Sequence, residues 1–337
     1  MQQTTIVDIA KLLGVAPSTV SRALNGSHEV GEKTRKLVQD AARKLNYVPN
    51  KAALSLLRIK TKTIGVIVPN LSYHYFSAAL QGIESEASER GFTVIASQSM
   101  ESEEKEKKAI TDMLRGGVDG VLISLAQYSN RLEHLIDLQS ILPVVMFDRV
   151  AEHFNCSKVT VNNVTGAFSA VNHLAKIGCR RIAYMAGPKD LLISKRRQDG
   201  FNMAMYKHQL EIDTSLIIHC EFDHQKALKA AINLLSRKDR PDGIFAVSDR
   251  VAIAALCAAK KLNLKVPKQI AIVGFNDEPI SSLITPSLSS VSQPAYEMGK
   301  TGAKILIDQI EAKSKSKLVI KSFTTKLKIR ESTLLKK

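Results

Sequence analysis

The segment Val15–Arg22 carries side chains whose types and spacing suit recognition of DNA bases. It follows a short helical pattern and a turn that contains Gly14, an arrangement in which a second helix enters the major groove by its N-terminal end. A helix starting at Pro17 exposes Pro17, Ser18 and Arg22. The Arg22 guanidinium can bond O6 and N7 of guanine together, worth about 1–3 kcal/mol of discrimination. The alternative is an ordinary helical hairpin with an exposed arginine.

Three other segments contain residue patterns that resemble other kinds of functional site. Gly299–Thr301 resembles the end of a phosphate-binding loop, but Pro294 stands where the first glycine belongs, and the pattern there is helical. His219–His224 is rich in metal-ligating side chains, yet in a strand only alternate residues share a face. The charge run Glu101–Lys108 is typical of the solvated start of a helix. Because no G-x-S-x-G or H-E-x-x-H pattern occurs, we expect no enzyme, no catalytic residue, no metal site and no cofactor.

Composition indicates a folded protein of two or three domains with a polyanionic partner. The 337 residues are 45% hydrophobic and 24% charged, which excludes a disordered chain. The net charge is +16, from 48 Lys plus Arg against 32 Asp plus Glu. The first sixty residues hold ten cations and four acids, so +6 is concentrated there. The four cysteines form no C-x-x-C pair, which favours reduced thiols over a disulfide scaffold or a zinc cluster.

The first sixty residues show the periodicity of short helices. A capping-box pattern begins at Thr5, and apolar residues follow at helical spacing as far as Gly14. A second helix starts at Pro17, and a third runs from about Gly31 to Leu45. The segment 51–57 is another short helical stretch, and the polar linker 58–63 marks the domain boundary.

From Thr63 onward, apolar runs of four to eight residues alternate with amphipathic segments of helix length. Such runs predict parallel strands covered on both faces. The predicted strands are 64–68, 93–96, 120–125, 144–147, 182–186, 216–219, 244–247 and 270–274. Eight units fit one barrel or two sheets. Because the irregular stretch 150–163, with its strand-like 158–161, interrupts the rhythm, we predict an α/β core of two doubly wound subdomains that bind ligands at the strands' carboxyl ends.

Taken together, these segments resemble the LacI/GalR family of bacterial transcription regulators. The resemblance covers essentially the whole chain and rests on the following segments: Thr5–Lys11, Gly14–Val15, Ser18–Gly26, Thr34–Arg35, Leu45–Asn50, Thr63–Asn70, Gly117–Val121, Ser248–Asp249, Ile272–Asp277 and Gln293–Pro294. It implies a helix-turn-helix headpiece (1–49), a hinge helix and linker (50–62), and a periplasmic-binding-protein-like core (63–337). The two subdomains of that core would be about 63–160 plus 291–322 and about 161–290 plus 323–337.

The resemblance also implies how DNA is bound. The implied contacts are Thr5, Pro17, Ser18, Thr19, Ser21, Arg22, Asn25, Asn50, Ala53 and Leu56. In the family a hinge helix forms on operator DNA and inserts a leucine from each subunit into the minor groove. That leucine is here Leu56, with Ala53 three residues earlier on the same face, and the inserted wedge kinks the duplex. The alternative is that the leucines of this segment only pack against the core.

For a small effector, the resemblance implies contacts from both subdomains. They are Asn70, Tyr73, Tyr75, Phe76 and Asp148 from the first, and Arg197, Phe222, Asp249 and Asn276 from the second. Such polar groups can hold hydroxyls while Phe76 and Phe222 cover a sugar face. Asp249 has an alternative interpretation as a helix cap, and Asp277 has a similar one. Lys195 and Arg196, beside Arg197, make a sugar acid or sugar phosphate a candidate as well as a neutral sugar.

The expected partners are a double-stranded palindromic operator, a small effector and a second copy of the chain. Only five residues follow Ser332, too few for a leucine-heptad helix, so we expect a dimer instead of a tetramer. With no signal-peptide pattern and no apolar run of membrane length, we expect a cytoplasmic, nucleoid-associated protein and no membrane partner. The alternative function is the solute-binding component of a transporter, which the basic headpiece disfavours. Whether the effector releases DNA or promotes binding stays open.

Overall fold

The structure is a computed structural model of the chain, and it describes residues 4–24, 27–45, 47, 60–127, 132–312, 314 and 316–334. The chain divides into two compact units, Met1–Thr61 and Lys62–Lys337, which we call the headpiece and the core. Within the described residues, no helix is both long and apolar enough to cross a bilayer.

The headpiece consists of three short helices around a small apolar centre. They are α1 (Ile6–Leu13), α2 (Pro17–Leu24) and α3 (Glu32–Lys44), which confirms the three helices predicted for this region. The predicted helix 51–57 lies outside the described residues. Side chains from all three helices and the loop before α3 meet in one cluster: Ile9, Ala10, Val20, Ala23, Val30, Val38 and Ala41.

The start and end of α1 follow directly from its sequence. The Thr5 hydroxyl accepts a hydrogen bond from the main-chain N–H of Asp8, and the Asp8 carboxylate accepts one from the Thr5 N–H at 2.8 Å. This is the predicted capping box, which satisfies two N–H groups that have no partner within the helix. Gly14 ends the helix with φ of 66°, a conformation that favours glycine, and turns the chain into α2.

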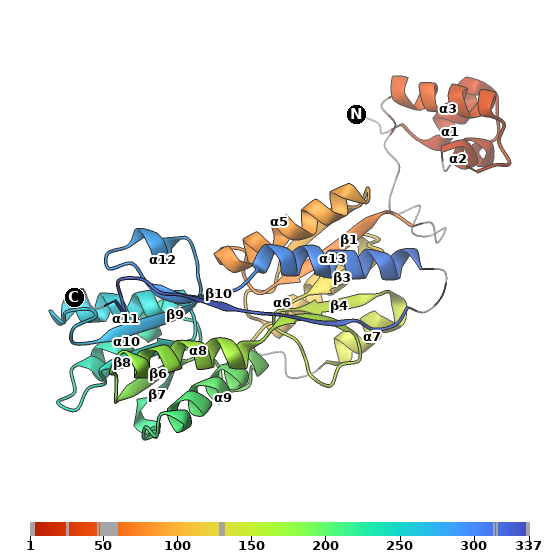
Figure 1. Cartoon of the computed structure of the whole chain (residues 1–337). Helices are drawn as coiled ribbons and strands as arrows, with labels where there is room; N and C mark the ends of the chain where they lie inside the picture. The colour runs from red at the N-terminus through yellow and green to blue at the C-terminus, as the bar shows by residue number, and fades with distance from the viewer. Residues whose placement is uncertain are drawn as a thin grey trace. The chain divides into compact units, whose positions relative to one another are not determined.

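The core contains two sheets, each covered by helices, which confirms the prediction of two doubly wound subdomains (Figure 1). We call them the first and second lobes. The sheet of the first lobe has the order β11-β5-β4-β3-β1-β2, and all its strands are parallel. Its strands are β1 (Thr63–Val68), β2 (Thr93–Gln98), β3 (Gly120–Ile123), β4 (Val144–Phe147), β5 (Ser157–Val161) and β11 (Ile320–Phe323).

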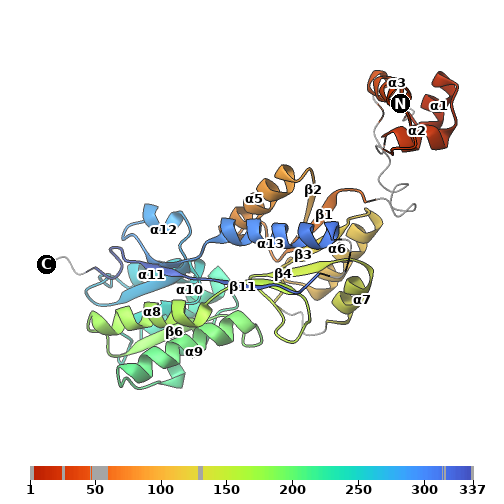
Figure 2. The same ribbon diagram turned by 45° about the vertical axis from the view of Figure 1, so that its right-hand side comes forward.

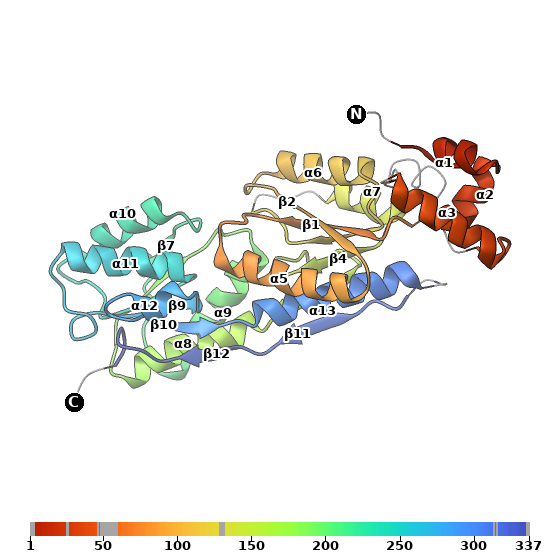
Figure 3. The same ribbon diagram turned by 90° about the horizontal axis from the view of Figure 1, so that it is seen from above.

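Alternate residues of the first sheet face two different helix layers. One layer is α5 (His74–Glu89) with α13 (Ala295–Glu311), and the other is α6 (Glu103–Arg115) with α7 (Glu133–Ile141) (Figure 3). Val66 and Leu122 pack into the cluster of the first layer, while Ile67 and Val121 pack into that of the second. The apolar runs are continuous because both faces are buried. The edge strands β2 and β11 are the exceptions, since most of each is exposed.

The second lobe repeats this plan with the strand order β12-β10-β9-β8-β6-β7. Its strands are β6 (Ile182–Ala186), β7 (Ile217–His219), β8 (Gly243–Ala246), β9 (Ala271–Asn276), β10 (Ser289–Ser292) and β12 (Lys326–Lys328), of which only β12 runs antiparallel to its neighbour. Its helices are α8 (Asn163–Lys176), α9 (Leu192–Lys207), α10 (His224–Leu235), α11 (Asp249–Lys261) and α12 (Ile280–Leu283), with the 3-10 turn η1 (Thr214–Leu216).

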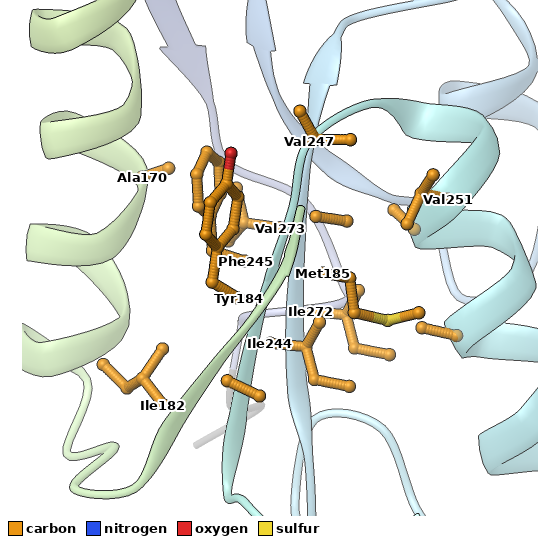
Figure 4. Close-up of a cluster of buried hydrophobic side chains, with 14 of the residues drawn as sticks. Ala170, Ile182, Tyr184, Met185, Ile244, Phe245, Val247, Val251, Ile272 and Val273 are labelled. Atoms are coloured by element: carbon orange, nitrogen blue, oxygen red, sulfur yellow. The ribbon is translucent and has the colours of Figure 1, made fainter. Parts of the chain in front are cut away.

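Aromatic stacking fills the interior of the second lobe. Tyr184 stacks on Phe245 with ring centroids 5.1 Å apart and on Phe201 of α9 at 5.4 Å. Figure 4 shows Tyr184 and Phe245 on the side of Ala170, and Met185 on the opposite side of the sheet, toward α11. The lobe is therefore a rigid support for the side chains at its strand ends.

The chain passes between the lobes at three places, which lie between β5 and α8, between β10 and α13, and between β11 and β12. Each lobe is thus built from separate segments of the sequence. Helix α13 returns to the first lobe and lies along α5 (Figure 2). Three short connections between two packed bodies are the construction that permits hinge closure around a ligand.

The contact between α5 and α13 explains Gly299, the glycine whose surrounding sequence resembles the end of a phosphate-binding loop. A Cβ on Gly299 would lie 1.9 Å from the carbonyl oxygen of Ala79, and one on Gly82 would lie 2.0 Å from that of Tyr296. The two helix backbones approach so closely that only glycine fits. Gly299 therefore allows α13 to pack closely against α5.

We predict that Gly299→Ala destabilises the core by about 1–3 kcal/mol or more, because the added methyl group forces two main chains apart. Urea unfolding of the full chain measures this free energy. Gly116→Ala is the matched control, since the nearest atoms to its Cβ would lie at an ordinary 3.4 Å. Equal unfolding free energies for the two variants would contradict the packing role of Gly299.

Candidate functional site

Helix α2 presents the predicted DNA-binding side chains on its outer face. Pro17, Ser18 and Arg22 are exposed, whereas Val20 is fully buried. Thr19 and Ser21 are half-buried. The helix carries no acid in its first turn, so its positive N-terminal end is free to approach a phosphate or a base.

Arg22 forms an ion pair that DNA can replace. Its Nε lies 3.2 Å from Oε2 of Glu29, and the two side chains are 58% and 59% exposed. Exposed pairs of this kind contribute about 0–1 kcal/mol, less than the 1–3 kcal/mol of a bidentate contact with guanine. The guanidinium can therefore exchange Glu29 for a base edge.

Other predicted DNA contacts are placed differently. Thr5 is exposed and holds the capping box of α1. Asn25, Asn50, Ala53 and Leu56 lie outside the described residues.

A narrow cleft lies between the two lobes of the core, at the carboxyl ends of their strands. The structure brings seven of the nine predicted effector residues together in its lining: Tyr73, Tyr75, Phe76, Asp148, Arg197, Phe222 and Asn276. Tyr73, Tyr75, Phe76 and Asp148 come from the first lobe, and the other three come from the second. A ligand here contacts both bodies at once.

Arg197 is the most constrained group in the cleft. The side chain is 2% exposed, its Nε donates to Oδ1 of Asn163 at 2.8 Å, and its guanidinium lies 3.7 Å from the ring centroid of Phe275. A second nitrogen donates to the Val247 carbonyl at 2.5 Å. These contacts aim the rigid fork of the guanidinium into the cleft, where it can hold two oxygens of one ligand.

Asp148 faces the cleft from the first lobe. It is 6% exposed, and burial raises the pKa of its carboxyl, an effect that Arg149 and Arg197 oppose. Burial also lowers the pKa of Arg197 to about 10, against the influence of Asp148. Two buried groups of opposite charge, one on each lobe, suit a ligand with several hydroxyls.

The backbone is strained at three of the lining residues. Asp148, Phe222 and Asn276 have φ values of 58°, 55° and 115°, which side-chain-bearing residues rarely adopt. Asp148 directly follows β4, Asn276 ends β9, and Phe222 follows β7. Such conformations cost about 1–3 kcal/mol each and cluster at functional sites. They turn these side chains toward the cleft.

Two predicted residues do not line the cleft. Asn70 turns inward on its own loop, where its Oδ1 accepts from the N–H of Ser72 at 2.8 Å. Asp249 is fully buried as the first residue of α11, and Ser248 stands at the cap position. The alternative interpretation of Asp249 as a helix cap is therefore also inexact.

The Asp249 carboxylate connects three elements of the second lobe. It accepts hydrogen bonds from the main-chain N–H of Glu278 at 2.7 Å and from the hydroxyls of Ser281 at 2.9 Å and Ser290 at 2.5 Å. Burial raises its pKa to about 7, and the three hydrogen bonds oppose that shift. This network fixes the loop that follows β9, which carries Asn276 and Glu278 to the cleft.

Six lining residues were missed by the sequence analysis: Arg149, Ile193, Ser248, Arg250, Glu278 and Gln293. Four of them are within two residues of a predicted site residue, because adjacent positions after a strand point in different directions. Their position after a strand was the available signal. The distinction between Asp249 and its neighbours required the three-dimensional structure.

Arg149 lies between Phe76 and Phe222, the two aromatic rings that were predicted to cover a sugar. Its guanidinium carbon lies 5.7 Å from the ring centroid of Phe76 and 5.1 Å from that of Phe222. Because these rings belong to different lobes, Arg149 links the lobes across the cleft.

The two cations next to Arg197 lie outside the cleft lining. Arg196 forms an ion pair with Glu152 at 2.6 Å, and Lys195 lines a neighbouring hollow. The segment considered for metal binding is used locally: His219 bonds the Gly187 carbonyl at 2.7 Å, and Asp223 caps α10. Among the described residues, no cluster of three or more His, Cys, Asp or Glu could hold a metal ion.

Comparison with known proteins agrees with the division of the chain into a headpiece and a core. Residues 5–50 match the family described as bacterial regulatory proteins, lacI family, and residues 171–333 match the periplasmic binding protein-like domain. The ribose operon repressor of Halalkalibacterium halodurans is 33% identical over 330 residues, which cover 98% of this chain and 97% of that protein. The chain belongs to the LacI family.

Solved structures of a transcriptional regulator and of the lac repressor share the fold over at least 98% of this chain. The transcriptional regulator CelR in complex with cellobiose has a TM-score of 0.75 and 29% identity, with 98% of this chain and 100% of that chain covered. The lac repressor dimer bound to operator and the anti-inducer ONPF has a TM-score of 0.84 and 24% identity, covering 99% and 100%. The LacI-family assignment makes this chain a DNA-binding repressor that responds to a small effector, and not an enzyme.

We predict that the free energy of unfolding of this LacI-family protein decreases as the pH rises from about 4 to about 7, because of Asp249. The folded protein holds a proton on this carboxyl up to about pH 7, whereas the unfolded chain releases it near pH 3.8. The folded state binds more protons within that window, so the free energy of unfolding falls by up to about 1.4 kcal/mol per pH unit.

Urea unfolding at a series of pH values measures this slope. Asp249→Asn should reduce the slope by the contribution of one proton, about 1.4 kcal/mol per pH unit at most. Asp137→Asn, at an exposed residue, should leave the slope unchanged. A slope that is the same in Asp249→Asn and in the unsubstituted protein would show that the buried carboxyl is ionised throughout.

Proposed function

We propose that the chain represses a carbohydrate-utilisation operon. In this proposal it binds a palindromic operator as a homodimer through α2, and a small sugar-like effector changes its DNA affinity by closing the two lobes. The observation that carries the proposal is the cleft that Arg197 and Asp148, both buried, line from opposite lobes. A repressor acts on the chromosome, so the site of action is the bacterial cytoplasm.

The relatives support a sugar as the effector class. The ribose operon repressor and the CelR–cellobiose complex are both named for carbohydrates. The cleft of this chain also combines aromatic rings with buried hydrogen-bonding side chains, the composition that binds polyhydroxy ligands. Closure shifts DNA affinity only if the ligand binds the closed core better than the open one.

The proposal for DNA combines base reading with an inserted wedge. Helix α2 is short and reads a few base pairs, so a two-fold dimer and a palindrome with half-sites about one helical turn apart are required for specificity. The second DNA contact that we propose is the hinge segment, with Leu56 in the minor groove and Asn50 and Ala53 beside it.

A thermal-shift screen of the full chain against sugars, sugar acids and sugar phosphates identifies the effector. A ligand present at 100 times its Kd adds about 2.7 kcal/mol of stability. Any ligand found is then titrated into a gel-shift assay with operator DNA, where the proposal requires that it change the operator affinity. A ligand that stabilises the core without changing operator affinity would instead favour a solute-binding role.

We predict that Arg22→Ala weakens specific operator binding by about 1–3 kcal/mol and leaves effector binding intact, because one bidentate base contact is lost. Fluorescence anisotropy with operator and with scrambled DNA measures the specificity ratio. Lys44→Ala, at the end of α3, removes the same charge elsewhere on the headpiece. If both variants lose the same small affinity for both DNAs, Arg22 contributes charge only.

We also predict that Arg197→Ala abolishes the response to effector while operator binding persists, because the ligand loses its contact with the second lobe. Asp148→Asn tests the opposite lobe with little change of shape and should weaken the same response. Lys207→Ala, at the other end of α9, is the control. Calorimetry that returns unchanged effector affinity for both cleft variants would place the effector site elsewhere.

A further inference from the structure

The N-terminal end of α11 opens into the cleft without the usual capping interaction. Ser248 stands at the cap position, yet its side chain makes no capping hydrogen bond. The residue is 5% exposed, it lines the cleft, and its hydroxyl has no hydrogen-bond partner. The first turn of this 13-residue helix contains the buried acid Asp249, whose carboxyl is used by Glu278, Ser281 and Ser290, so the Ser248 hydroxyl remains the unpartnered donor at this helix end.

Arg250 extends from the same helix end into the cleft. Its guanidinium lies 4.6 Å from the ring centroid of Tyr73, which belongs to the first lobe. Within the described part of the chain, no carboxylate lies within 4 Å of Arg250. The group is held in place by an aromatic face, and its N–H donors remain available to a ligand.

Arg149 approaches the same tyrosine from the first lobe. It is 4% exposed and donates to Glu101 at 2.7 Å, while its buried Nε has no partner. Burial raises the pKa of Tyr73; the charges of Arg250 and Arg149 oppose that shift, and those of Glu101 and Asp223 add to it. Both arginines line the cleft together with Tyr73, one from each lobe.

One of the three arginines that line the cleft is already paired, since Arg149 forms an ion pair with Glu101 at 2.7 Å, whereas Arg197 and Arg250 form none among the described residues. The lining also holds two carboxylates, Asp148 and Glu278. Burial raises the pKa of Asp148, and the charges of Arg149 and Arg197 oppose that shift. Glu278 forms no ion pair among the described residues; its main-chain N–H donates to Asp249, and its carbonyl accepts from the N–H of Ser281.

We propose that this end of the cleft, formed by Ser248, Arg250, Arg149 and Tyr73, binds an oxyanion carried by the effector. The ligand class is a small polyhydroxy molecule with a phosphate or carboxylate group. The oxyanion lies against the N-terminus of α11, and the hydroxyls lie toward Arg197, Asp148 and Asn276. This inference rests on the proposed effector role of the cleft and specifies the charge of the effector.

The test compares charged and neutral probes that share a carbon skeleton. Isothermal titration of the full chain uses ribose with ribose 5-phosphate, and glucose with glucose 6-phosphate and gluconate, plus inorganic phosphate alone. The variants are Arg250→Gln and, as a matched control, Lys261→Gln at the exposed C-terminal end of the same helix. The two substitutions remove the same charge about one helix length apart.

The expected result is that a phosphate or acid form binds roughly tenfold or more tightly than its neutral partner. Arg250→Gln should reduce that preference to about threefold or less, whereas Lys261→Gln should preserve it. Higher salt should weaken only the charged probes. Whether the sugar phosphate or the sugar acid binds more tightly distinguishes the two oxyanions.

The proposal is overturned if the neutral sugars bind as tightly as the charged ones, if no charged probe binds, or if Arg250→Gln and Lys261→Gln behave alike. A gel-shift titration separates this failure from failure of the effector role. If a neutral sugar changes operator affinity and Arg250→Gln responds normally, the effector role stands and the oxyanion site is rejected. If a charged probe binds through Arg250 without changing operator affinity, the site stands and the effector role is rejected.

Discussion

The guanidinium of Arg197 is the constraint on which the cleft depends. It is almost completely removed from water, yet its direct hydrogen-bond acceptors are the neutral oxygens of Asn163 and Val247. Burying a charge without an ion pair is costly, and the lowered pKa of Arg197 reflects this cost. In the function that we propose, a ligand oxygen between Arg197 and Asp148 reduces this cost for both lobes, which links ligand binding to lobe closure through one side chain.

The fold supplies the precision that this linkage needs. Both lobes bury their central parallel strands on two faces, so these strands are rigid supports. The strained residues Asp148, Phe222 and Asn276 turn side chains from the strand ends into the cleft. The buried Asp249 network fixes the loop after β9 in the same way. In the proposed function, closure changes the backbone at the three connections between the lobes and leaves the lobes themselves unchanged.

Sequence reasoning succeeded where local pattern and burial agree. The runs 144–147 and 182–186 became β4 and β6 with the predicted bounds, because strands buried on both faces are apolar throughout. It failed for β10, β11 and β12, whose serines and lysines carry no apolar run. At the cleft, prediction from residue type included Asp249, which does not line it, and omitted Arg149 and Arg250, which do. Which of several polar neighbours faces a ligand depends on backbone torsion and distant packing, which one sequence does not contain.

The most direct test of an effector-controlled repressor is the reciprocity of its two binding equilibria. The affinity for operator is measured with and without saturating effector, and the affinity for effector is measured with and without saturating operator. Thermodynamic linkage requires the two ratios to be equal, and allosteric coupling typically makes them about 5–150. We predict equal ratios within this range for the unsubstituted protein. An effector that binds free and operator-bound protein with the same affinity would contradict the account, because the cleft would then have no influence on DNA binding.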